Sequence, residues 1–218
     1  FTATALLVFA IGIGATTAIV SVADALLVRP MLVPQVAPVM TVWQYNRETG
    51  LGQQDVAPGN AIDWTKRGRS FESVAIAEPC SVNTNIPGRE PEYLSAAFVT
   101  EQFFRVLNAP MLHGRPFLPQ DYYRGAGRVA IFSYPFWRDR FASDPSVVGK
   151  AVPLDDGATY TIVGVMPPGI ELRLFDRRST RPEPQVWLAK QGFNEFEPNL
   201  RGTGYWNVIG RLAPGVSI

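Results

Sequence analysis

Residues 149–169, GKAVPLDDGATYTIVGVMPPG, carry the plainest structural pattern in the chain. Two apolar runs, the second rich in β-branched residues, stand on either side of Asp155-Asp156-Gly157, which is typical of a tight turn. Pro167-Pro168-Gly169 then ends the second run, because proline cannot continue a central strand. The pattern predicts a β-hairpin, and it places the two adjacent carboxylates in a turn rather than in an acid/base pair.

On both sides of this hairpin the sequence alternates between short strand patterns and short helix patterns. We expect helices after Asn60 and Thr100 as N-caps, and a third after Ser133 with Pro135 in its first turn. The strand patterns cover residues 39–45, 73–82, 91–99, 127–133, 185–189 and 205–212. Such interleaving predicts an α+β fold over a mixed sheet, in one domain or in two subdomains.

The N-terminal run is of a different kind, because residues 2–23 hold no charged side chain. As a helix this run would measure about 33 Å, against a hydrocarbon core of about 30 Å. Gly12 and Gly14 would allow a neighbouring membrane helix to approach closely. Arg29 and Pro30 mark the exit from the apolar run.

These features divide the chain into three parts. We expect residues 1–28 to form one N-terminal transmembrane helix in contact with the lipid bilayer. Residues 29–40 hold three prolines at four-residue spacing, which favours an extended connector. Residues 41–218 would then form the main extracytoplasmic domain.

Two alternatives compete for the apolar run. A cleaved signal peptide is supported by Ala23-Asp24-Ala25, although the run exceeds the roughly 7 to 15 apolar residues of a signal core. A dinucleotide-binding loop would use Gly12 and Gly14, but Thr17 stands where the third glycine or alanine belongs. A membrane span is favoured over both, and the secreted protein and the cytoplasmic nucleotide-dependent enzyme stay as alternatives.

The composition excludes several classes of chemistry. The 218 residues have a net charge of +1, and no basic stripe alternates with aromatics, so we expect no nucleic-acid partner. The single cysteine, Cys80, and the single histidine, His113, cannot supply a disulfide or a thiolate–imidazole metal cage. We interpret Cys80 as buried and inert and His113 as a solvated loop residue. Gly149-Lys150 lacks the rest of a phosphate-binding loop, so no catalytic, metal or cofactor residues are expected.

Seven stretches, taken in order, resemble one family: AIGIGATTAIVSVADALLVRP, APGNAIDWTKRGRSFE, GREPEYLSAAFVTEQFFRVL, HGRPFLPQD, FSYPFWRDRFASDPSVVGK, YTIVGVMPPG and GRLAPGVS. The chain is similar to the N-terminal membrane helix and MacB-like periplasmic core domain of FtsX-like ABC transporter permeases. More narrowly, it resembles the acidobacterial-type duplicated orphan permeases.

The resemblance implies a fragment of a permease subunit in the bacterial inner membrane, with a C-terminally incomplete main domain in the periplasm. That domain would transmit motion driven by a separate cytoplasmic ATPase, for efflux, lipoprotein release or envelope control. Implied partners are the remaining permease helices, the ATPase, and a periplasmic adaptor or second permease half. The alternative is a secreted extracytoplasmic binding or structural module whose signal peptide is cleaved.

No catalytic residues accompany the resemblance, and the residues singled out are structural. They are Gly12, Gly14, Arg29, Pro30, Trp64, Phe71, Gly114, Arg115, Phe117, Trp137, Gly149, Gly164, Pro167, Pro168, Gly169, Trp187, Gly210 and Arg211.

Overall fold

The computed structural model describes residues 39–45, 47, 50, 52–84, 90–154, 158–170, 182–191 and 199–216. The expected transmembrane helix and most of the expected connector lie outside these residues, together with Gly12, Gly14, Arg29 and Pro30. Within the described ranges, no helix combines the length and the apolar character that crossing a membrane requires.

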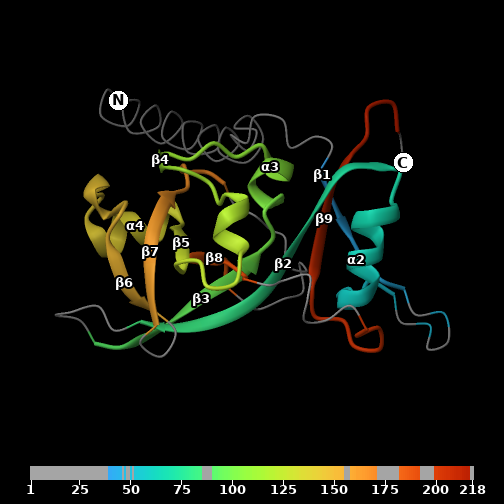
Figure 1. The fold of residues 1–218 in the computed structure, drawn as a ribbon, viewed down its shortest axis with the longest axis horizontal. Helices are drawn as coiled ribbons and strands as arrows, with labels where there is room; N and C mark the ends of the chain where they lie inside the picture. The colour runs from blue at the N-terminus through green and yellow to red at the C-terminus, as the bar shows by residue number, and fades with distance from the viewer. Residues whose placement is uncertain are drawn as a thin grey trace, which may run out of the picture. The chain divides into compact units, whose positions relative to one another are not determined.

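The described residues contain one mixed sheet of nine strands, in the order β1-β9-β2-β3-β8-β5-β7-β4, with β6 paired to β7 and to the end of β2 (Figure 1). The strands are β1 (Val39–Val42), β2 (Phe71–Thr84), β3 (Glu92–Val99), β4 (His113–Gly114), β5 (Val129–Phe132), β6 (Ala151–Leu154), β7 (Ala158–Val165), β8 (Val186–Ala189) and β9 (Asn207–Leu212). The β3–β8 and β5–β7 pairs are parallel, and the other pairs are antiparallel. The predicted mixed sheet is confirmed, whereas a division into two subdomains stays a prediction.

The hairpin predicted from residues 149–169 is present. β6 and β7 pair antiparallel, and Leu154 at the end of β6 pairs with Ala158 at the start of β7, whereas the residues of the predicted turn, Asp155, Asp156 and Gly157, lie outside the described residues. Along β7, Thr159 and Thr161 are exposed, whereas Tyr160 and Ile162 are buried, so the sequence alternation matches the two faces of the strand.

Among the described residues, three α-helices and two short 3₁₀ turns lie against the sheet. They are α2 (Pro58–Arg67), α3 (Phe103–Leu107), α4 (Tyr134–Phe141), η2 (Pro119–Tyr122) and η3 (Pro145–Val147). The predicted start of α4 is confirmed. Ser133 Oγ accepts a hydrogen bond from the Phe136 N–H at 3.4 Å, and Pro135 occupies the first turn.

The other two predicted N-caps are wrong. α2 begins at Pro58, whose fixed φ suits a first helical position, so Asn60 lies inside the helix and donates to Gln44 Oε1 at 2.9 Å. α3 is preceded by Gln102, while Thr100 Oγ1 accepts from the Ile76 N–H at 3.0 Å. Both side chains therefore bind distant backbone or side-chain groups rather than their own helices.

Three apolar clusters fill the space between the described sheet and its helices. The first packs α3 against the middle of the sheet, the second packs α4 against β5–β8, and the third packs α2 against β2 and β9. β2 contributes Ala75 to the first cluster, Val82 to the second and Ile76 to the third. The 14 residues of β2, drawn as a long arrow in Figure 1, thus join all three cores.

Candidate functional site

A close approach of two backbones defines the segment that begins at Gly114. Gly114 on β4 faces Gly164 on β7. A Cβ atom on Gly114 would lie 2.1 Å from the Val163 carbonyl oxygen, and one on Gly164 would lie 2.6 Å from the Arg115 carbonyl oxygen. Gly114 also has a φ of +74°, which side chains other than glycine rarely adopt. Both glycines are therefore required by the geometry of this pair of strands.

An ion pair between Arg115 and Asp121 connects the two ends of the segment that follows Gly114. Arg115 donates to both carboxylate oxygens of Asp121, at 2.7 and 3.1 Å, and Asp121 also accepts from the Leu118 N–H at 2.8 Å. The Asp121 side chain is 7% exposed, so its charge needs this partner. Phe117, within the same segment, packs edge to face on Phe104 at 5.7 Å. Asp121 belonged to the HGRPFLPQD stretch but was not singled out, because its role depends on a fold-back that periodicity does not reveal.

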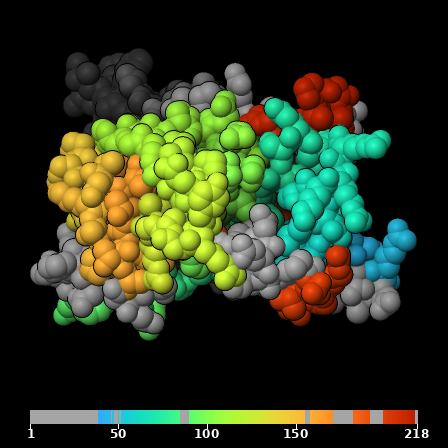
Figure 2. All heavy atoms as spheres, viewed as in Figure 1, coloured from blue at the N-terminus to red at the C-terminus, as the bar shows by residue number. Residues whose placement is uncertain are grey.

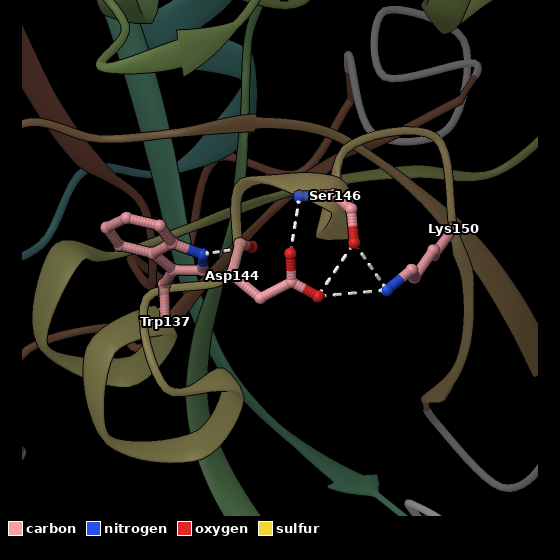
Figure 3. Close-up of polar contacts among 4 residues, drawn as sticks. All are labelled: Trp137, Asp144, Ser146 and Lys150. Atoms are coloured by element: carbon pink, nitrogen blue, oxygen red, sulfur yellow. Dashed lines mark hydrogen bonds and ion pairs between the residues drawn. The ribbon is translucent and has the colours of Figure 1, made fainter.

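A group of polar contacts connects α4 to the segment that leads into β6 (Figure 3). Trp137 Nε1 donates to the Asp144 carbonyl oxygen at 2.8 Å. The Asp144 carboxylate accepts from the Ser146 N–H at 2.8 Å and from the Ser146 hydroxyl at 2.7 Å. Lys150 Nζ completes the group, 3.2 Å from the carboxylate and 2.8 Å from the hydroxyl. Gly149 beside it has a φ of +89°, so this position also favours glycine.

These contacts lower the pKa of Asp144 to about 2, chiefly through the hydrogen bonds from Ser146 and then through Lys150. Because the folded-state pKa lies below the unfolded one, the stabilisation is present above about pH 4 and is lost as the pH falls through about 2. We expect Ser146→Ala to raise the pKa toward its usual 3.8, and Lys150→Ala to raise it less. An NMR titration of the Asp144 side chain would measure the pKa in each variant. A larger pKa increase in Lys150→Ala than in Ser146→Ala would contradict the conclusion that Ser146 lowers this pKa most.

At the other end of the sheet, an aromatic ring fills the space beside a glycine. A Cβ atom on Gly210 would lie 2.4 Å from the ring of Phe71, on the neighbouring strand. Arg211 Nη2 donates to the Val106 carbonyl oxygen and so connects β9 to α3. Trp64, half-buried on α2, packs against the third apolar cluster.

Trp187 lies at the centre of the first cluster, on β8. It is 2% exposed, and its ring centre lies 5.0 Å from Phe103 and 6.2 Å from Phe104. Its indole Nε1 is buried and has no hydrogen-bond partner among the described residues. Phe117, Trp137 and Trp206 are buried as well.

Pro167, Pro168 and Gly169 end β7 in a turn, as predicted, with Gly169 at a φ of +81°.

His113 and Cys80, the histidine and the cysteine of the chain, do not form a catalytic site together. His113 lies half-buried in β4, with its ring 5.2 Å from that of Trp137, so its interpretation as a solvated loop residue is wrong. Cys80 is half-buried on β2 rather than buried. Within the described residues, no group of three or more histidine, cysteine, aspartate or glutamate side chains could hold a metal ion.

A groove of about 750 Å³ lies between the end of α2 and the α3–η2 segment. Figure 2 shows a recess between these two parts of the surface, coloured teal and green. Tyr122 lines the groove, and its buried hydroxyl has no hydrogen-bond partner in the part of the chain that the structure describes. Burial, followed by the charges of Glu101 and Asp121, raises the pKa of Tyr122, so the hydroxyl stays protonated.

Comparison with known proteins points to one family. The sequence model described as "MacB-like periplasmic core domain" matches residues 2–218. No curated protein sequence matches the chain.

Three solved structures share the fold at low sequence identity. The periplasmic region of MacB from Actinobacillus actinomycetemcomitans is 15% identical with a TM-score of 0.55, over 82% of this chain and 76% of that one. The extracellular domain of the noncanonic ABC-type transporter YknZ from Gram-positive bacteria is 16% identical with a TM-score of 0.53, over 81% and 84%. A domain assigned to a permease protein from Porphyromonas gingivalis is 16% identical with a TM-score of 0.53, over 77% and 67%.

Proposed function

The chain belongs to the MacB-like periplasmic core domain family, and from this premise we propose that it transmits ATP-driven motion from the inner membrane into the periplasm as part of an ABC transporter permease. The predicted resemblance is thereby confirmed. The likeness to the MacB and YknZ domains supports a domain of this fold outside the cytoplasm. The proposed role needs no catalytic residue in this chain.

The position of the first and last described strands carries the proposal. β1 and β9 pair antiparallel, and Val39 at the start of β1 faces Arg211 near the end of β9. The segments that lead into β1 and out of β9 therefore leave from the same end of one strand pair. A movement of two membrane anchors attached there would act on adjacent strands.

The sheet offers a continuous route from this strand pair to the rest of the domain. β9 pairs with the first half of β2, from Phe71 to Ala77, and β3 pairs with the second half, from Ala77 to Thr84. Displacing β9 along β2 would break several backbone hydrogen bonds at once, which resists shear. The strands would consequently move as a unit when the β1–β9 end moves.

Within this proposal, residues 1–28 contact the lipid bilayer and the ATPase is a separate cytoplasmic subunit. The remaining permease helices complete the membrane part, and a periplasmic adaptor or second permease half receives the motion. Efflux, lipoprotein release and envelope control are the roles that such transmission would serve.

A topology experiment tests the placement of the domain. The native gene would be fused after Ile218 to a reporter that is active only outside the cytoplasm, and the membranes would be extracted with alkali. We expect an active reporter that stays in the membrane. An active but soluble reporter would favour the secreted module with a cleaved signal peptide, and an inactive reporter would contradict both.

A distance measurement tests the transmission itself. The full-length permease with its ATPase would be placed in nanodiscs holding gadolinium-chelating lipids, with a spin label at Tyr93, which is 80% exposed. We expect the distance from the label to the lipids to change between the nucleotide-free and the vanadate-trapped states. The control is a pair of spin labels at Tyr93 and Tyr123, and the distance between these two labels should not change. An unchanged distance to the lipids would contradict the proposal.

A further inference from the structure

One edge of β2 has no described strand beside it over part of its length. β3 pairs with β2 only from the Ala77–Val99 pair onward, whereas β9 pairs with β2 as far as Phe71. At Ile76 the missing strand is replaced by Thr100, whose hydroxyl accepts from the Ile76 N–H and whose own N–H donates to the Ile76 carbonyl, both at 3.0 Å. Beyond Ile76, toward Phe71, no described strand takes the place of β3.

The direction in which the Val74 N–H and carbonyl point follows from the direction of the same groups of Ile76. Because the Ile76 N–H and carbonyl both bind Thr100, they point away from β9. Backbone groups two residues apart in a strand point to the same side. The N–H and carbonyl of Val74 therefore point away from β9 as well, toward the groove that Val74 lines.

The groove lies along the same edge of β2 that β3 occupies from Ala77 to Thr84. One wall is the end of α2, with Thr65 and Lys66, and the other is the α3–η2 segment, with Tyr122. α2 and α3 belong to different apolar clusters, and β2 contributes to both. An extended chain lying along β2 would thus enter between two helical layers.

We propose that this groove binds an extended segment of a partner protein, which adds to β2 at Val74 as an extra strand. Main-chain hydrogen bonds give affinity in this mode of recognition, and pockets for alternate side chains give selectivity. The groove offers one basic side chain, Lys66, and one acidic side chain, Glu72, and it is also lined by Arg105 and Glu101, which lie 4.0 Å apart as an ion pair. It therefore complements a segment that carries both an acidic and a basic residue beside apolar or hydroxyl side chains.

A designed peptide tests this mode directly on the full-length permease in nanodiscs. The probe is an acetylated, fluorescent KVTVTVTE peptide, and its binding is followed by fluorescence anisotropy. We expect saturable binding, and an affinity about tenfold lower when alternate backbone amides of the peptide are N-methylated. Absence of binding would overturn the proposal, and so would equal binding of the methylated peptide.

Two protein variants test whether the peptide binds in the groove. Thr65→Trp fills the groove from an exposed helix position, so we expect an affinity lower by about tenfold. Arg67→Trp is the matched control, because Arg67 is exposed on the same helix but does not line this groove. Hydrogen exchange at the Val74 amide should slow about tenfold on saturation. Equal effects of both substitutions, or unchanged exchange at Val74, would overturn the proposal. These measurements read peptide binding alone, so the proposal can fail while the proposed transmission of motion stands.

Discussion

Gly114→Ala is expected to lower the free energy of unfolding by about 3 kcal/mol or more, for two separate reasons. The φ of +74° costs a residue with a Cβ about 1 to 2 kcal/mol. The new Cβ would also lie 2.1 Å from the Val163 carbonyl oxygen, which is backbone and cannot move aside without separating β4 from β7. Backbone hydrogen bonds such as Arg115 N–H to Val163 O, at 2.8 Å, would then be lost.

Urea unfolding of the purified protein, followed by tryptophan fluorescence, measures this loss. Gly149→Ala is the matched control: its φ is +89°, but no atom lies within 4 Å of the added Cβ. The control should therefore lose only the backbone cost of about 1 to 2 kcal/mol. Equal losses in the two variants would show that backbone conformation, and not the contact with Val163, decides the requirement for glycine at residue 114.

The elements that the sequence predicted correctly are those set by local patterns. The β6–β7 hairpin follows from alternation and a turn, and the start of α4 follows from a serine with a proline two residues later. The failures are residues with distant partners. Asn60 binds Gln44, and Thr100 binds Ile76, so the local capping rule was overridden by contacts made only in the folded chain.

The same distinction applies to the candidate sites. Gly114 and Gly164 were both singled out, yet nothing in the sequence indicated that they face each other. His113 was interpreted as a loop residue because its segment is rich in proline and glycine, and a strand of two residues is too short to show a periodicity that would indicate otherwise. The groove beside Val74 could not be predicted at all, since it depends on where β3 leaves β2. Local patterns thus predicted the longer strands of this fold, but neither the two-residue β4 nor the unpaired edge of β2.

Trp187→Ala is expected to lower the free energy of unfolding by about 3 to 5 kcal/mol, the cost of removing a large aromatic from a core. The side chain is 2% exposed on β8, which lies between β3 and β5, and its ring packs on Phe103 and Phe104. Its removal would leave a cavity between the sheet and α3. Urea unfolding again gives the measurement, with far-UV circular dichroism, which reports the backbone structure, in place of tryptophan fluorescence.

Trp187→Phe separates the two properties of this side chain. The indole Nε1 has no hydrogen-bond partner within the described ranges, so its loss removes no described bond and relieves the burial of an unpaired donor. The smaller ring still fills most of the space, and we expect a loss of about 1 to 2 kcal/mol from the remaining void. A loss as large as that of the alanine variant would show that the Nε1 donates to a bound water. The contribution of Trp187 would then rest on a polar contact as well as on packing against Phe103 and Phe104.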